Sequence, residues 1–186
     1  MRTLIAELRA DTHGYAAMGK WYAQPGYWII AVHRLGCWAN RLPVWTRVPV
    51  WLLYRILHLS YRAFNIELWA GSKGANLGAG VCLLHPNNLY FGPNVTLGEH
   101  CLVHHEVTLG MGTVPGTPQL GRNVVLYPGA RLQGGITIGD NVVIGANCVV
   151  SRNVAPDTVV LPAANRMLPR ALSPLTRQRE MQHPHA

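Results

Sequence analysis

Residues 132–150 read Leu-Gln-Gly-Gly-Ile-Thr-Ile-Gly-Asp-Asn-Val-Val-Ile-Gly-Ala-Asn-Cys-Val-Val. In this stretch an apolar residue returns every six positions, and glycine follows it at positions 139 and 145. The same spacing begins at residue 77 and gives twelve positions in all. These are Leu77, Leu83, Phe91, Leu97, Val103, Leu109, Leu120, Leu126, Leu132, Ile138, Ile144 and Val150. Two insertions interrupt the spacing, one of two residues before Phe91 and one of five residues before Leu120.

A second position of the repeat, four places further on, carries small or β-branched residues from Val81 to Val154. One short strand and one turn per repeat predict a parallel β-helix, in which three repeats form a triangular coil. Both positions then point inward and stack on their equivalents in the next coil, about 4.8 Å away. Twelve repeats give about four coils, so the chain is predicted to be mainly β.

The composition agrees with one folded unit and excludes several other classes. The chain has 186 residues, of which 49% are hydrophobic and 13% are charged, so disorder is excluded. The longest charge-free apolar run in the first third, residues 48–54, is far shorter than the roughly 20 residues of a membrane span. The four cysteines show no metal-binding spacing, and we expect them to be small buried side chains in the reducing cytoplasm.

Charge divides the chain into three parts. Residues 1–70 carry eight basic and three acidic side chains, a net charge of +5, whereas residues 71–163 have four of each. Residues 164–186 have four arginines and one glutamate and are expected to be a partly mobile tail. Because the predicted β-helix is neutral, nucleic acid is not an expected partner.

Residues 1–70 are predicted to be helical. Apolar residues recur at helical spacing before residue 40, and a second such segment covers residues 44–68, where Arg47, Arg55 and Arg62 interrupt the apolar positions. One interpretation is that these helices cover the open edge of the β-helix. The alternative is a basic, aromatic helix that lies on an anionic membrane surface, peripheral to its inner face.

Two histidines fall at the same phase of the repeat. His85 is the third residue of its repeat and His105 is the third residue of the repeat three places later, so we expect them on one edge of consecutive coils. His104 and Glu106 flank His105. A histidine at such a corner can accept a proton from an alcohol. The second insertion lies nearby, in the loop of residues 110–118 that contains Gly110 and Gly112, and this loop is expected to form a wall of the same site.

The repeat resembles that of the left-handed β-helix acyltransferases, and the details are similar to their serine acetyltransferase branch, especially its short relatives in polysaccharide pathways. The matching segments are Val-Thr-Leu-Gly at 107–110, Gly-Ala at 129–130, Ile-Gly-Ala at 144–146 and Ala-Val-His-Arg-Leu-Gly at 31–36. The resemblance implies a left-handed parallel β-helix, acetyl-CoA as acetyl donor, no metal, and a homotrimer with sites between subunits.

The resemblance also implies roles for individual residues. His85 would be the general base, and His105 would orient it or contact the acceptor. Backbone N–H groups of Gly110 and Gly112 would bind the developing oxyanion. Other contacts with acetyl-CoA would come from Ala130, Ala146 and Arg166. The acceptor would be bound by Asp11, His104, Glu106 and Thr117.

Three positions depart from the family pattern. Leu84 stands where the family has the aspartate of its Asp-His pair, and Gly116 and Thr117 replace the Arg-His of an Arg-His-Pro motif. Because these groups would pair with the charges of serine, we expect an O-acetyltransferase that acts on a sugar or polysaccharide precursor. The alternatives are a serine O-acetyltransferase and a non-catalytic β-helix scaffold.

Overall fold

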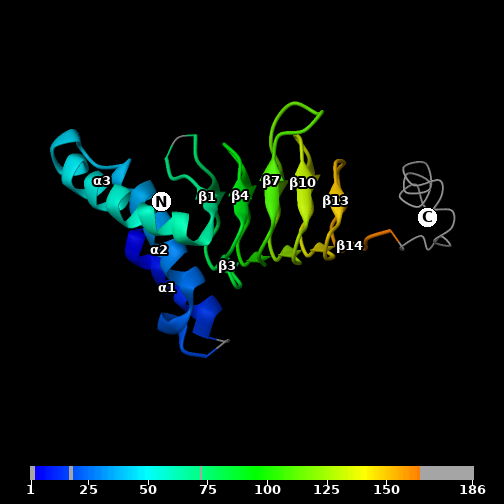
Figure 1. Ribbon diagram of the computed structural model, residues 1–186, viewed down its shortest axis with the longest axis horizontal. Coiled ribbons are helices and arrows are strands. Elements are labelled where there is room, and N and C mark those ends of the chain that lie inside the picture. The colour runs from blue at the N-terminus through cyan, green and yellow to red at the C-terminus, as the bar shows by residue number, and fades with distance from the viewer. Residues whose placement is uncertain (1–2, 17–18, 72, 164–186) are drawn as a thin grey trace, which may run out of the picture.

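The computed structural model describes residues 3–16, 19–71 and 73–163, and it places a helical region at one end of an elongated β-helix (Figure 1). The helices are α1 (Leu4–Ala16), α2 (Pro25–Ala39) and α3 (Val44–His58), with 3-10 turns η1 (Trp21–Ala23) and η2 (Leu59–Phe64). Proline at the first position of α2 fits the missing N–H of a helix start. The helical segment expected over residues 44–68 ends earlier, because its last residues form a strand.

Short strands of two or three residues follow the helices. They are β1 (Ile66–Leu68), β2 (Asn76–Leu77), β3 (Cys82–Leu83), β4 (Leu89–Phe91), β5 (Thr96–Leu97), β6 (Leu102–Val103), β7 (Thr108–Gly110), β8 (Gln119–Leu120), β9 (Val125–Leu126), β10 (Arg131–Gln133), β11 (Thr137–Ile138), β12 (Val143–Ile144), β13 (Val149–Val150) and β14 (Val159–Val160).

The strands form three parallel sheets, which are the three sides of the β-helix. Sheet A has the order β1-β4-β7-β10-β13, sheet B has β2-β5-β8-β11, and sheet C has β3-β6-β9-β12-β14. The chain passes from A to B to C and then enters the next coil. This confirms the predicted mainly β fold and agrees with the left-handed β-helix implied by the resemblance.

The register confirms the inward position of the repeat. On sheet A the partners run Leu68, Phe91, Leu109, Leu132 and Val150, each side chain stacked on the next. All five are at least 95% buried. Apolar side chains stacked in this way supply the hydrophobic stabilisation of a fold with strands too short to be stable alone.

The β-helix has about five coils rather than the four expected. The extra strands are β1, which lies before the expected boundary at residue 71, and β14, which follows the last counted repeat. Neither was counted because the six-residue spacing is lost between β1 and β2 and again before β14. Thr113, which matched the second repeat position, is exposed because it lies in the insertion.

Polar side chains of the helical region cover the open edge of the first coil. The hydroxyl of Tyr15 accepts from the N–H of Leu83 (2.6 Å), and Arg34 donates to the carbonyls of Leu77 and Gly78. His58 Nε2 lies 3.2 Å from the carbonyl of Leu68. Each of the three sheets therefore has backbone groups of its first strand satisfied by a helical side chain, which confirms the capping interpretation for these contacts.

Candidate functional site

Three histidines gather at the corner where sheet C passes into sheet A. His85 follows β3, whereas His104 and His105 lie one coil further on, between β6 and β7. We call these three residues and Glu106 the histidine corner. His85 is exposed, and the His105 side chain is 38% exposed, so both imidazoles are open to solvent.

The backbone ladder corrects the predicted equivalence of His85 and His105. The N–H of Leu84 donates to the carbonyl of Val103 (2.7 Å), but the N–H of Glu106 donates to the carbonyl of Asn87 (2.8 Å). Asn87 therefore occupies the rung opposite His105. His85 and Pro86 are the two inserted residues, so His85 projects from a widened corner, and its φ of 49° is unusual for a residue other than glycine.

The electrostatics show that the three imidazoles lie near one another. The pKa of His104 lies below its ordinary value, first because the ring is partly desolvated and then because of the charges of His105 and His85. The His104 ring stacks on Tyr127, with 5.2 Å between centroids and 11° between planes. His105 Nδ1 lies 3.8 Å from Glu106 Oε1. The corner thus holds three neighbouring imidazoles, and histidine is the side chain best suited to proton transfer near neutral pH.

Tyr127 was not among the residues expected at this corner, although the repeat contains a signal for it. Leu126 pairs with Val103 across sheet C, so the residues that follow them, Tyr127 and His104, share one phase of the repeat. Extending the phase comparison from the histidines to the next coil would have found this aromatic partner.

The glycine-containing insertion lies at a different corner. It leaves sheet A after β7 and enters sheet B at β8, so β7 separates it from the histidine corner. A strand of three residues spans about 10 Å. Within a single chain, the insertion with Gly110, Gly112 and Thr117 therefore lies at a different corner from His85. Thr117 is also largely buried, and its carbonyl accepts from the Gln119 side chain.

The insertion folds against the next coil. The N–H of Gly135 donates to the carbonyl of Val114 (3.2 Å), and the N–H of Gly134 donates to that of Gly110 (2.9 Å). A Cβ on Gly135 would lie 2.2 Å from the carbonyl oxygen of Pro115, so only glycine allows this close approach. The loop is held on the β-helix and projects from it beside β7 and β10 (Figure 1).

Two of the three further residues expected to contact acetyl-CoA lie in the described part of the chain. Ala130 and Ala146 lie at the same corner as the histidines, in the fourth and fifth coils. Ala146 is exposed, whereas Ala130 is fully buried. Arg166 lies outside the described residues.

Asp11, which the resemblance implies as an acceptor-binding residue, lies in a buried ion pair in this structure. Its side chain is fully buried, and both carboxylate oxygens accept from Arg34, at 3.1 and 3.2 Å. One oxygen also accepts from the N–H of Gly80 at 2.9 Å. The ion pair joins α1 and α2 to the first coil and leaves no exposed carboxylate surface for a ligand.

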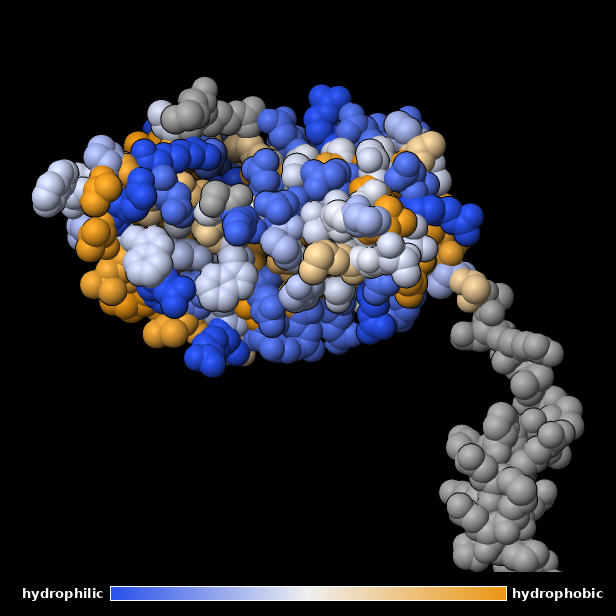
Figure 2. Space-filling view, turned by 90° about the horizontal axis from the view of Figure 1, so that it is seen from above, coloured by the Kyte–Doolittle hydropathy of each residue, from blue (hydrophilic) through white to orange (hydrophobic). Residues whose placement is uncertain are grey.

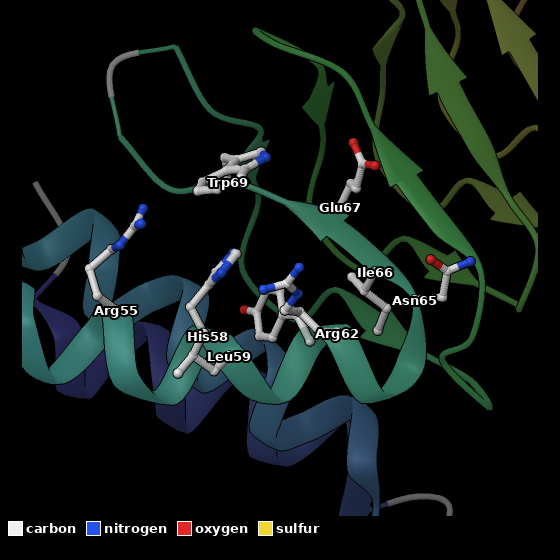
Figure 3. Close-up of a pocket in the computed structure, with 9 residues that line it drawn as sticks. Arg55, His58, Leu59, Arg62, Asn65, Ile66, Glu67 and Trp69 are labelled. Atoms are coloured by element: carbon white, nitrogen blue, oxygen red, sulfur yellow. The ribbon is translucent and has the colours of Figure 1, made fainter.

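A cavity of about 510 Å³ lies one coil before the histidine corner (Figure 3). Arg55, His58 and Arg62 line it from α3 and η2, and Glu67 and Trp69 line it from β1 and the segment that follows. Asn65 also lines the cavity, and its amide donates to the side chain of Asn88 (2.7 Å), three residues after His85. The cavity was not expected from the sequence, because its two walls meet only where β1 folds back against α3 and η2, as the contact of His58 with the carbonyl of Leu68 shows.

Within residues 3–16, 19–71 and 73–163, no group of three or more His, Cys, Asp or Glu side chains is arranged to hold a metal ion. None of the described helices has the length and hydropathy needed to cross a bilayer.

Residues 117–152 match the family model for the bacterial transferase hexapeptide (six repeats). A serine acetyltransferase of Synechococcus elongatus is 36% identical over 152 residues, which are 79% of this chain and 58% of that relative. A serine acetyltransferase of Helicobacter pylori is 32% identical over 133 residues, which are 68% of this chain and 73% of that relative. The chain thus spans less than two thirds of the first relative.

Solved structures show the same architecture. The serine acetyltransferase of Neisseria gonorrhoeae in complex with serine has a TM-score of 0.71 and 25% identity, covering 86% of this chain and 67% of that one. The Brucella abortus serine acetyltransferase in complex with coenzyme A has a TM-score of 0.66 and 25% identity, covering 84% of this chain and 65% of that one.

Proposed function

Because this chain belongs to the serine acetyltransferase family of hexapeptide-repeat transferases, we propose that it transfers an acetyl group from acetyl-CoA to the hydroxyl of L-serine. The observation that carries this proposal is the histidine corner, where an exposed imidazole projects from a coil of the β-helix beside two others. The ligands named for the neighbouring structures, serine and coenzyme A, support the same two substrates.

In the proposed reaction His85 accepts the hydroxyl proton of the acceptor while the oxygen attacks the thioester carbonyl of acetyl-CoA. The carbon–sulfur bond then breaks, and the departing thiolate takes the proton from the imidazolium. No acyl-enzyme forms, and atoms and charge balance within the two substrates and one imidazole. General base catalysis by such a group typically accelerates a reaction by about 10² to 10⁴. Backbone N–H groups of Gly110 and Gly112 stabilise the oxyanion.

This mechanism requires more than one copy of the chain. The glycines and the histidine corner lie at opposite ends of the strands of sheet A, so one chain does not bring them together. We therefore propose a homotrimer in which the insertion of one subunit lies against the histidine corner of the next. The position of the insertion, fixed on the next coil and projecting outward, supports this arrangement.

The acceptor proposed here differs from the sugar expected in the sequence analysis, because the relatives and neighbouring structures are serine acetyltransferases. One observation favours a neutral saccharide hydroxyl as the second candidate. Leu84, Gly116 and Thr117 lack the charged or imidazole groups of the family pattern, and a serine carboxylate without a cation would be poorly bound.

The test is release of free coenzyme A thiol from acetyl-CoA with L-serine and a panel of sugars. His85→Asn is the informative variant, because asparagine tolerates the positive φ at this corner. We expect it to lower kcat at least 100-fold. His100→Asn is the matched control, since His100 is also exposed, has a φ of 58° and lies at a different corner.

Turnover with serine that His85→Asn abolishes would support the proposal, whereas turnover with saccharides alone would support the second candidate. An unaltered rate in His85→Asn would show that another group is the base. Failure to bind acetyl-CoA would overturn the enzymatic proposal and favour a scaffold.

A further inference from the structure

One side of α3 is apolar and exposed. Its outer face consists of Trp45, Val48, Leu52, Ile56 and Leu59, the last in the turn of η2 that continues the helix. These side chains are 91%, 62%, 56%, 57% and 59% exposed, respectively. Their spacing of three or four residues places them on one stripe of the helix. The opposite side of α3 faces the rest of the protein through Tyr54, which is 2% exposed.

The apolar surface continues beyond the stripe. A groove of about 640 Å³ between α2 and α3 is lined by apolar side chains, among them Trp28, Val32, Leu57 and Phe64. Figure 2 shows hydrophobic residues gathered at the helical end of the molecule, next to strongly hydrophilic ones. A continuous exposed apolar surface of this kind marks a site of association.

Arginines border the outer face of α3 on one side. Arg55 lies over the rings of Trp51 and Trp69, 5.3 and 5.7 Å from their centroids, and with Arg62 it lines the cavity of Figure 3. Among the described residues, neither guanidinium has a carboxylate oxygen within 4.0 Å, although Glu67 lies in the same cavity. Two arginines are therefore free to bind anions beside an apolar stripe.

We propose that the outer face of α3, with Arg55 and Arg62, docks this protein on an anionic lipid bilayer. The apolar stripe enters the boundary between headgroups and acyl chains, and the two guanidiniums bind lipid phosphates. Tryptophan at this depth has its apolar ring in lipid and its N–H near water. This inference goes beyond the proposed acetyl transfer and does not depend on it.

Charge distinguishes a bilayer from a second copy of the chain as the occupant. Residues 44–64, which form α3 and η2, carry three arginines and no acidic side chain. A two-fold interface would place this basic surface against itself, because such an interface uses the same patch on both subunits. An anionic bilayer instead supplies the opposite charge.

The experiment is sedimentation of the full chain with vesicles of phosphatidylcholine alone and of phosphatidylcholine with 30 mol% phosphatidylglycerol. Arg55→Gln with Arg62→Gln tests the charged part, and Leu52→Ser with Ile56→Ser tests the apolar part at positions that are already exposed. Arg131→Gln with Arg152→Gln is the matched control, because both arginines are exposed on the β-helix. Circular dichroism checks that each variant is folded.

We expect binding to the anionic vesicles that weakens with added salt. The loss of two arginines should lower partitioning roughly 25-fold, because each contributes roughly fivefold near an anionic surface. The serine variant should also lose binding, and the control should retain it. Equal binding to both kinds of vesicle, or none to either, would overturn the proposal. Loss of an oligomer in the serine variant, measured by light scattering without lipid, would instead assign this face to a second copy.

Discussion

Replacing Asp11 with asparagine should destabilise the protein strongly, because it leaves the buried guanidinium of Arg34 without a counter-charge. Arg34 is 4% exposed and Asp11 is not exposed at all. Asparagine preserves the shape of the side chain, but it removes the charge and replaces one of the two acceptor oxygens by an amide donor. Breaking one partner of a buried ion pair costs about 3–5 kcal/mol. For a chain of this size, the loss corresponds to a fall in Tm of about 6–20 °C.

The protonation state of Asp11 also affects the stability that the ion pair with Arg34 contributes. Burial raises the pKa of its carboxyl, and the hydrogen bonds and charge of Arg34 oppose that rise. Arg34→Lys should have an intermediate effect, because lysine keeps the charge but loses the bidentate geometry. The hydrogen bonds that Arg34 donates to Leu77 and Gly78 would also be lost in part.

Thermal unfolding followed by circular dichroism measures both variants. Asp140→Asn is the control, since it alters the exposed pair in which Arg122 Nη2 lies 2.9 Å from Asp140 Oδ2. It should leave Tm nearly unchanged, because exposed pairs contribute little. An Asp11→Asn protein with an unchanged Tm and a raised KM for the acceptor would refute the structural role and restore the acceptor-binding one.

Three further predictions concern the interior and the histidine corner. Burial lowers the pKa of His33 to about 3, below its value of about 6.5 in the unfolded chain, so the unfolded state binds more protons between these two pH values. The free energy of unfolding should therefore fall by about 2 kcal/mol from pH 7.5 to pH 5. Urea titration measures this loss, which should be absent in His33→Gln. Leu109→Ala should cost about 3–5 kcal/mol in the same urea assay, because Leu109 is fully buried in the stack of sheet A, and a cost below 1 kcal/mol would contradict that packing. His85→Asn should raise the pKa of His104 in an NMR titration by removing a neighbouring positive charge, whereas an unchanged pKa would show that the two rings do not interact.

The sequence alone was sufficient for the β-helix. The six-residue pattern recurs twelve times, and each apolar residue packs on its equivalent in the next coil at a fixed separation. An irregular residue at a single position therefore does not change the predicted fold. From the same phase, His85, His104 and His105 were expected at one corner of consecutive coils. The strands β1 and β14 were not expected, because the spacing is irregular at both ends, where stacking neighbours exist on one side only.

Side-chain environment was decided only by the tertiary structure. The sequence could not show that Asp11 and Arg34, 23 residues apart, form a buried pair, since that depends on how α1 and α2 meet the first coil. The sequence likewise could not show that His85 lies in a two-residue bulge, with Asn87 in its place opposite His105. It also could not show that the glycine insertion lies at the other end of the strands of sheet A. Periodicity fixes which residues point inward. Contacts between elements that do not repeat depend on packing in three dimensions, and these contacts determine which polar groups are exposed and which groups meet.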